Sequence, residues 1–237
     1  MSGAVVLFSG GQDSTTCLAW ALKAQADDAP GFDDVAALSF DYGQRHAVEL
    51  RCADEITDAW GVQHWRLGLP ILHELHGGAL TDGSRKIEAQ ATTGYQADKK
   101  LPSTFIPGRN LMFFTAAAAF GVPRGFKTLV TGICQADHAG YPDCRGTFAH
   151  AAETAIRFAL DEPTFTIMPP LLYRTKAQTW LLAEELGVLE DVIRRTHTCY
   201  QGNRSVLHAW GYGCGECPAC SERANGWTQA FGDRAVV

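Results

Sequence analysis

The hexapeptide SGGQDS at residues 9–14 constrains the fold of this chain more than any other stretch. It follows the apolar run AVVLF at residues 4–8, which is short and rich in β-branched residues and therefore predicts a buried strand. After it, Leu18, Ala21 and Leu22 recur at helical spacing. Two glycines let the backbone turn tightly and approach a ligand, while the N–H groups that begin a helix attract anions. The sequence therefore predicts a phosphate site in a strand–turn–helix unit.

Strand patterns alternate with helix patterns as far as about residue 187. Apolar strand-like runs follow the first one at residues 35–40, 62–67, 128–132 and 165–168. Helical patterns separate them at residues 47–60, from 109 to 120, from about 145 to 160 and from 176 to 187. This alternation is typical of an α/β fold with a Rossmann-like, doubly wound parallel sheet. We expect a nucleotide-binding domain at 1–187 and a small zinc-binding region at 188–237.

One long segment, at about residues 77–104, breaks the alternation. Its runs TDGSRK and QADKK are polar and prone to turns. Long segments without secondary structure are uncommon in compact domains, and those that occur are often functional. We expect a lid that orders with substrate, and a mobile loop is the alternative.

Five cationic residues lie on connections that lead into helices, where the positive end of the helix dipole disfavours a positive charge. The carboxyl ends of parallel strands, where ligands of open α/β sheets bind, lie at the same edge of the sheet as these connections. We therefore expect an anion such as a triphosphate to gather at least three of them, although some could cap surface carboxylates. The five cations are Arg45, Arg109, Arg145, Arg174 and Lys176.

A cysteine cluster near the C-terminus predicts a metal site. Cys214, Cys217 and Cys220 are spaced by three residues, and thiols this close suit a tetrahedral ion with thiolate ligands. Cys199 is the expected fourth ligand, and His197 and His208 are the alternatives. Four protein ligands close off the ion, so we expect a structural Zn²⁺ with no catalytic role.

The charge balance limits the classes of partner. The net charge is −6 and the isoelectric point is near 5.7, which argues against a general nucleic-acid or membrane surface. The first strand-like run begins at residue 4, and no apolar stretch reaches membrane-spanning length. We expect a cytoplasmic protein that binds no nucleic acid and no membrane.

The SGGQDS turn resembles the loop of the PP-loop ATP pyrophosphatases, which holds the pyrophosphate that leaves when ATP is cleaved at its α-phosphorus. Further segments add to this likeness along the chain, in order. Together they resemble the 7-cyano-7-deazaguanine synthase family, which forms a nitrile in queuosine precursor biosynthesis. The segments are FDYGQRH at 40–46, PGRN at 107–110, GYPDCR at 140–145, PL at 170–171 with Lys176, and CY at 199–200 with the cysteine triplet.

The resemblance implies a reaction and a set of site residues. In this family the carboxylate of 7-carboxy-7-deazaguanine is adenylated by ATP, ammonia converts the acyl adenylate to an amide, and a second adenylation leads to the nitrile. Mg²⁺ with ATP and a homodimer are expected. Asp13, Arg109 and Lys176 are the expected catalytic residues. The expected ATP-binding residues are Leu7, Phe8, Ser9, Gly10, Gly11, Gln12, Asp13, Ser14, Thr15 and Arg109.

A guanine-like base presents N–H donors and needs an acceptor such as a carboxylate. Asp143 is the first candidate for this role and Asp137 the second. The alternative for Asp143 is that it caps the helix that starts near Arg145. Tyr141, Arg145 and Gln44 are the other expected substrate-binding residues.

Three other functions fit parts of the sequence. A PP-loop tRNA thiolase would need a persulfide-carrying cysteine such as Cys134 or Cys144, and a tRNA surface that the acidic balance does not favour. A PP-loop amide synthetase would stop before the nitrile. A zinc module for nucleic acid or protein would need basic and aromatic residues among the cysteines, and residues 214–220 lack them.

Overall fold

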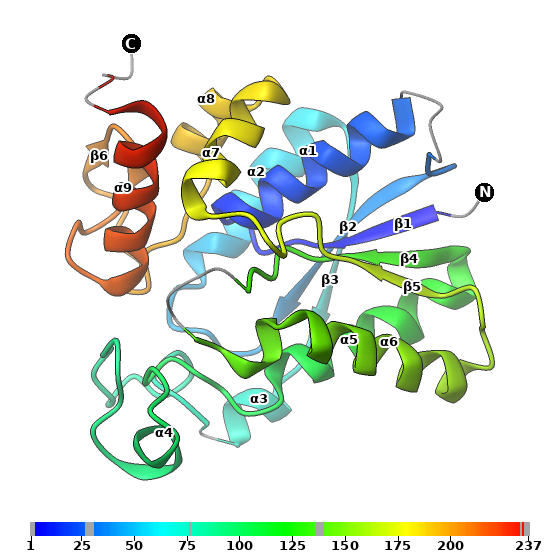
Figure 1. Ribbon diagram of the computed structural model, residues 1–237, viewed down its shortest axis with the longest axis horizontal. Helices are drawn as coiled ribbons and strands as arrows, with labels where there is room; N and C mark the ends of the chain where they lie inside the picture. The colour runs from blue at the N-terminus through cyan, green and yellow to red at the C-terminus, as the bar shows by residue number, and fades with distance from the viewer. Residues whose placement is uncertain (1–2, 27–30, 76, 136–139, 233, 235–237) are drawn as a thin grey trace.

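A parallel sheet of five strands forms the centre of the molecule (Figure 1). The computed structural model describes residues 3–26, 31–75, 77–135, 140–232 and 234. The strand order is β3-β2-β1-β4-β5, and neighbouring strands pair in parallel. The strands are β1 (Gly3–Leu7), β2 (Val35–Asp41), β3 (Gln63–Gly68), β4 (Phe126–Val130) and β5 (Thr166–Met168).

Helices cover both faces of the sheet, as the alternating pattern predicted. On β1, Ala4 and Val6 face α1 (Gln12–Ala26) and α2 (Val48–Trp60), whereas Val5 faces the opposite side. α7 (Lys176–Glu185) joins the first group of helices, and α5 (Arg109–Gly121) and α6 (Gly146–Leu160) form the second (Figure 1). The doubly wound α/β fold is therefore confirmed.

The position of β1 in the strand order determines where a ligand can bind. From β1 the chain adds β2 and β3 on one side, and β4 and β5 then add on the other side of β1. The connections that leave β1 and β4 therefore diverge at their carboxyl ends. A crevice of this kind is where doubly wound sheets bind their ligands.

The last fifty residues add a small layer against α7. They form α8 (Leu189–Arg195), a hairpin of β6 (Leu207–His208) and β7 (Gly211–Tyr212), and α9 (Pro218–Phe231). Trp227 of α9 packs edge-on against Trp180 of α7, with ring centroids 5.2 Å apart. These side chains belong to a hydrophobic cluster that includes residues on both sides of position 187. The predicted domain boundary at 187 stays a prediction.

The segment at 77–104 has more structure than its sequence suggests. It follows α3 (Ile71–Glu74) and contains the short helix α4 (Gly94–Asp98). The buried Gln96 side chain donates to the Phe105 carbonyl oxygen at 3.1 Å, and the Ala79 N–H donates to the Ser103 carbonyl oxygen at 2.8 Å. The expectation of a segment without secondary structure was therefore wrong. Its role as a lid stays a prediction.

Two short 3₁₀ turns complete the described chain, η1 (Val122–Arg124) and η2 (Pro142–Cys144). None of the helices in the described ranges combines the length and the apolar character that crossing a bilayer requires.

Candidate functional site

The glycine turn (residues 9–14) joins β1 to α1 at the carboxyl edge of the sheet. Gly10 has a φ of +78°, and a Cβ there would lie 2.4 Å from the carbonyl oxygen of Glu49, so the position requires glycine. Ser14 Oγ lies 3.2 Å from both the Ser9 nitrogen and the Gly11 carbonyl oxygen, which fixes the turn. Because α1 begins at residue 12, its free N–H groups and positive dipole end lie beside the turn and favour an anion.

Lys176 reaches the same turn from the start of α7. Its Nζ lies 2.8 Å from Asp13 Oδ2 and 3.1 Å from Asp13 Oδ1. Thr175 caps α7 with a reciprocal capping box, so the backbone that carries Lys176 is fixed. A Cβ on Gly226 of α9 would lie 2.5 Å from Lys176 Cγ, so α9 packs directly against the lysine. Two residues far apart in the sequence are thus held together at the glycine turn.

A cavity of about 290 Å³ opens at the carboxyl ends of β1 and β4. Its lining includes part of the glycine turn, the three tyrosines Tyr42, Tyr141 and Tyr200, and Arg109. Gln12 and Thr15, expected at the ATP site, are buried beneath it, and Gln12 Nε2 and Thr15 Oγ1 have no hydrogen-bond partner among the described residues. The predicted ATP-site residues that line the cavity are Leu7, Phe8, Ser9, Asp13, Ser14 and Arg109.

Arg109 and Asp143 lie side by side at the start of α5. Burial disfavours the charge of Arg109, but Tyr42, Tyr141 and Asp143 outweigh burial and raise its pKa. Burial also raises the pKa of the Asp143 carboxyl, and the nearby Arg109 partly offsets this. Asp143 Oδ2 accepts from the Asn110 N–H at 3.3 Å, and the Asn110 side chain donates to the Asp143 carbonyl oxygen at 3.0 Å. The structure thus places Asp143 against the first turn of α5 rather than at the start of α6.

The other predicted substrate residues are spread more widely. Tyr141 lines the cavity, whereas Gln44 is buried behind it and bonds to the Tyr42 N–H and to Glu49. Arg145 lines a separate hollow beside Gln135. Asp137 lies outside the described residues. Of the five cations at helix starts, Arg109 and Lys176 reach the glycine turn or its cavity, while Arg45, Arg145 and Arg174 line other hollows.

The segment after α8 also contacts the glycine turn. The His197 N–H donates to the Gly10 carbonyl oxygen at 3.0 Å, and a Cβ on Gly11 would lie 3.3 Å from the His197 carbonyl oxygen. Arg223 of α9 is buried and donates to Thr196 Oγ1 and Thr198 Oγ1, at 2.9 Å each. Residues 196–198 are therefore held between the glycine turn and α9.

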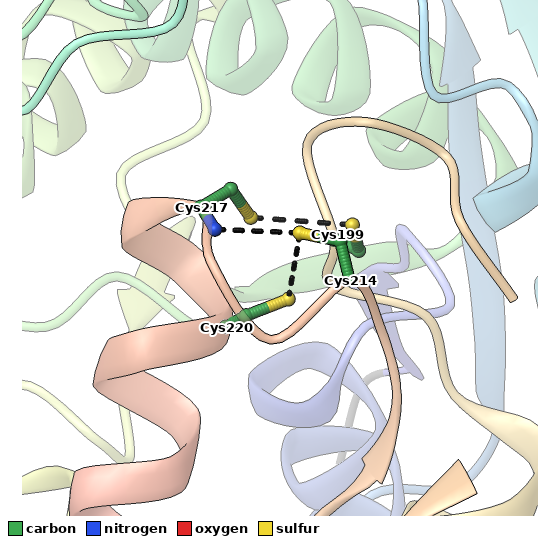
Figure 2. Close-up of side chains that lie close together, drawn as sticks. All are labelled: Cys199, Cys214, Cys217 and Cys220. Carbon is green, nitrogen blue, oxygen red and sulfur yellow. Dashed lines mark hydrogen bonds between the residues drawn. The ribbon is translucent and has the colours of Figure 1, made fainter. Parts of the chain in front are cut away.

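The four predicted cysteines come together beside this segment, with their sulfur atoms turned toward one another (Figure 2). All four Sγ atoms lie within 4.8 Å of one another, and His197 and His208 are not part of the group. Two of the distances are 3.8 Å, between Cys214 and Cys220, and 4.0 Å, between Cys217 and Cys199. Thiolates about 2.3 Å from a tetrahedral ion lie roughly 3.8 Å apart, so the cluster fits a metal of that geometry.

The surroundings of the cysteine cluster are adapted to it. Cys199 follows α8, Cys214 follows the hairpin, and Cys217 and Cys220 lie at the N-terminus of α9. Hydrogen bonds from the Cys217 and Cys220 thiols lower the pKa of Cys199 far below its ordinary value. A Cβ on Gly213 would lie 2.6 Å from Cys220 Sγ, so a side chain there would press into the cluster.

Comparison with known proteins identifies the family. The model of the family described as "Queuosine biosynthesis protein QueC" matches residues 3–231. The chain belongs to the QueC family. The 7-cyano-7-deazaguanine synthase of Acidovorax sp. (strain JS42) is 46% identical over an alignment that covers 98% of this chain and 95% of that protein. The synthase of Alkalilimnicola ehrlichii is 47% identical, with 97% and 95% covered.

Another relative with the same name, from Rhodopseudomonas palustris, is 47% identical to this QueC-family chain, and the alignment covers 95% of the chain and 93% of the relative. Solved structures align less closely. The alignment with the NMN synthetase of Francisella tularensis covers 100% of this chain and 89% of that protein, with a TM-score of 0.45 and 14% identity. The relatives are named synthases, so the chain is an enzyme.

Among the lining side chains that sequence reasoning did not predict as site residues are two titratable ones, His46 and Glu49. Both are buried, with 5% and 8% of their surface exposed. The signal available was their spacing of three residues at the start of a helix. A histidine and a carboxylate at this spacing are common on surfaces, and only the fold shows that these two are enclosed.

Proposed function

We propose that this enzyme converts 7-carboxy-7-deazaguanine and ammonia to 7-cyano-7-deazaguanine at the expense of ATP. The observation that carries the proposal is the glycine turn, with Arg109 at its cavity and Lys176 paired to Asp13 of the turn, in a chain about 46% identical to proteins named for this product. Adenylation of the carboxylate, amide formation and a second adenylation on the amide oxygen would release AMP and pyrophosphate.

In the proposed mechanism the protein contributes position and charge. The N–H groups of Gly10 and Gly11 and the start of α1 bind the leaving pyrophosphate. Lys176 and Arg109 stabilise the negative charge that builds up as the substrate carboxylate attacks the α-phosphorus. Mg²⁺ bound to the phosphates, with Asp13 within reach of them, would reduce their repulsion.

For substrate recognition the structure supports a division of roles. Tyr141 lines the cavity and is in position to contact the base. Asp143 supports the start of α5 and the Arg109 charge, and any role in reading the base would act from this buried place. Contacts of Gln44, Arg145 and Asp137 with the substrate, like the homodimer and the cytoplasmic location, stay predictions.

We also propose that the cysteine cluster holds one structural Zn²⁺ through Cys199, Cys214, Cys217 and Cys220. Four thiolates satisfy the preference of zinc for sulfur and leave no open position for chemistry. The near-tetrahedral spacing of the sulfur atoms supports this choice.

The test is a single incubation with product analysis. The enzyme is mixed with ATP, Mg²⁺, an ammonium salt and 7-carboxy-7-deazaguanine, and the base is analysed by mass spectrometry. We expect the nitrile, together with AMP and pyrophosphate. Amide as the final product, or ADP in place of AMP, would contradict the proposal.

A further inference from the structure

A second group of titratable side chains faces the cavity that contains the glycine turn. His46 and Glu49 line it together with Asp13 and Arg109. His46 lies in the connection between β2 and α2, and Glu49 lies in the first turn of α2. The proposed adenylation uses neither of them, although burying a histidine and a carboxylate costs free energy unless they have partners.

The Glu49 carboxylate is held in place by two donors. His46 Nε2 lies 3.2 Å from Glu49 Oε2, and Gln44 Nε2 lies 3.2 Å from Glu49 Oε1. Gln44 is itself fixed, because its Oε1 accepts from the Tyr42 N–H at 2.9 Å. The arrangement is therefore a preorganised carboxylate–imidazole pair, which we call the His46–Glu49 dyad.

The second nitrogen of His46 is left without a partner. Among the described residues, nothing forms a hydrogen bond with His46 Nδ1, which is buried. Since Nε2 faces a carboxylate, it carries the proton in the neutral ring, and Nδ1 then presents a lone pair. A buried acceptor with no partner is rare in folded proteins and points to a bound donor. The groups nearest this ring are Glu49, the Tyr200 ring at 6.0 Å, and His197.

The charges around the cavity select the kind of donor. Arg109 lines the cavity and Lys176 is bonded to Asp13 of the glycine turn, and a cation beside either of them would be repelled. Two carboxylates of the described chain line the cavity, and because Asp13 is already paired with Lys176, Glu49 is the one left to face a cation. A small cation with several N–H donors matches a carboxylate beside an imidazole lone pair.

We propose that the His46–Glu49 dyad binds ammonium and takes its proton, so that ammonia reaches the acyl adenylate as a nucleophile. This inference rests on the proposed function, because it concerns the second substrate of that reaction. Ammonium is the main form at neutral pH and has no lone pair to attack with. A base at the point of use is therefore required.

The step balances in atoms and charge. One N–H bond of ammonium breaks and its proton passes to His46 Nδ1, while Glu49 stabilises the imidazolium. The freed lone pair forms the C–N bond with the acyl carbon. The bond from that carbon to the AMP oxygen breaks, and AMP leaves with the electron pair. The nitrogen then loses a second proton to water, which gives the neutral amide.

The experiment separates adenylation from amide formation. Adenylation is followed as exchange of labelled pyrophosphate into ATP with 7-carboxy-7-deazaguanine and without ammonia. Amide and nitrile are then measured with ammonium, and hydroxamate with hydroxylamine, which is largely uncharged at neutral pH and needs no base to become a nucleophile. The variants are His46→Gln and Glu49→Gln. Glu55→Gln is the matched control, because Glu55 lies exposed on the same helix.

For both dyad variants we expect amide formation from ammonium to fall ~10²–10³-fold, the range of general-base catalysis. Exchange and hydroxamate formation should stay within roughly 3-fold of the parent enzyme, as for groups that act on ammonium alone. Exchange that falls as far as amide formation, in a variant with unchanged thermal unfolding, would overturn the inference. So would unchanged amide formation. If His46→Gln does not fold, the near-isosteric Glu49→Gln decides. A parent enzyme that shows no exchange would refute the proposed function instead.

Discussion

At the scale of single residues, the ion pair between Lys176 and Asp13 fixes a cation at the glycine turn. It joins the first helix to the seventh, across 163 positions of sequence. Both side chains are partly exposed to solvent, so the pair itself contributes little to stability. Its value lies in placing a cation beside the N–H groups of the glycine turn.

Removing this cation should affect chemistry more than folding. We expect Lys176→Met to lower the rate of adenylation by ~10²–10³-fold, because a charge aimed at the transition state is lost. Pyrophosphate exchange measures that rate. Lys23→Met removes an equal charge from the exposed end of α1 and serves as the control. Equal exchange rates in the two variants would show that Lys176 does not act on the phosphates.

Single residues also mark where sequence reasoning succeeds and fails. The glycine turn and the cysteine spacing were predictable because each is a local pattern whose chemistry needs little context. His46 was not, because its significance depends on burial and on an unpartnered Nδ1, which only packing creates. The contact of Asp143 with α5 was not predictable for the same reason, since its partner Asn110 lies 33 positions away.

At the scale of elements, α9 links the cysteine cluster to the catalytic edge. Its N-terminus carries Cys217 and Cys220, and its middle contacts α7 through Gly226. The order of strands and helices could be read from hydrophobic periodicity, because a doubly wound sheet alternates regularly. The structure of the segment at 77–104 could not be predicted in this way. It depends on side chains that donate hydrogen bonds to backbone elsewhere in the chain, such as that from Gln96 to the Phe105 carbonyl oxygen.

The close approach of α9 and α7 gives a prediction for one glycine. Gly226→Ala should favour the helix in isolation, yet its methyl group would lie 2.5 Å from Lys176 Cγ. Overpacking of this kind costs about 1–3 kcal/mol, so the free energy of unfolding should fall. Because Lys176 must shift, exchange should fall as well.

Denaturant unfolding and pyrophosphate exchange measure the two effects of Gly226→Ala. Thr228→Ala, at an exposed position two residues further along the same helix, should leave both near the parent values. If Gly226→Ala leaves the rate of pyrophosphate exchange unchanged, α9 can shift without displacing Lys176.

At the scale of the whole molecule, one segment, residues 196–199, contacts both the cysteine cluster and the glycine turn. Cys199 is one of the four cysteines of the cluster. Two residues earlier, the His197 N–H donates to the Gly10 carbonyl oxygen of the glycine turn. Arg223 holds the residues around His197 from the other side. The cysteine cluster is therefore connected to the glycine turn by backbone.

Removal of the metal should therefore weaken two properties together. A ligand present at a thousand times its Kd stabilises a fold by ~4 kcal/mol, which in a chain of this size shifts Tm by roughly 8–16 °C. We expect a loss of that order after chelation or in Cys217→Ser, with metal content followed by mass spectrometry. ATP affinity, measured by calorimetry, should decrease in parallel.

The control for metal removal is Cys17→Ser, which changes a buried thiol of α1 outside the cluster. It should lose stability but keep its metal. Full ATP affinity after complete loss of the metal would show that residues 196–198 hold their place without help from the cysteines.

The bond between His197 and Gly10 ties nearly the last part of the chain to nearly the first. During translation, the glycine turn leaves the ribosome long before its partner is made. A nascent chain that ends before residue 197 has the glycine turn without the hydrogen bond from the His197 N–H. The anion site proposed at this turn is therefore complete only once residue 197 has been synthesised.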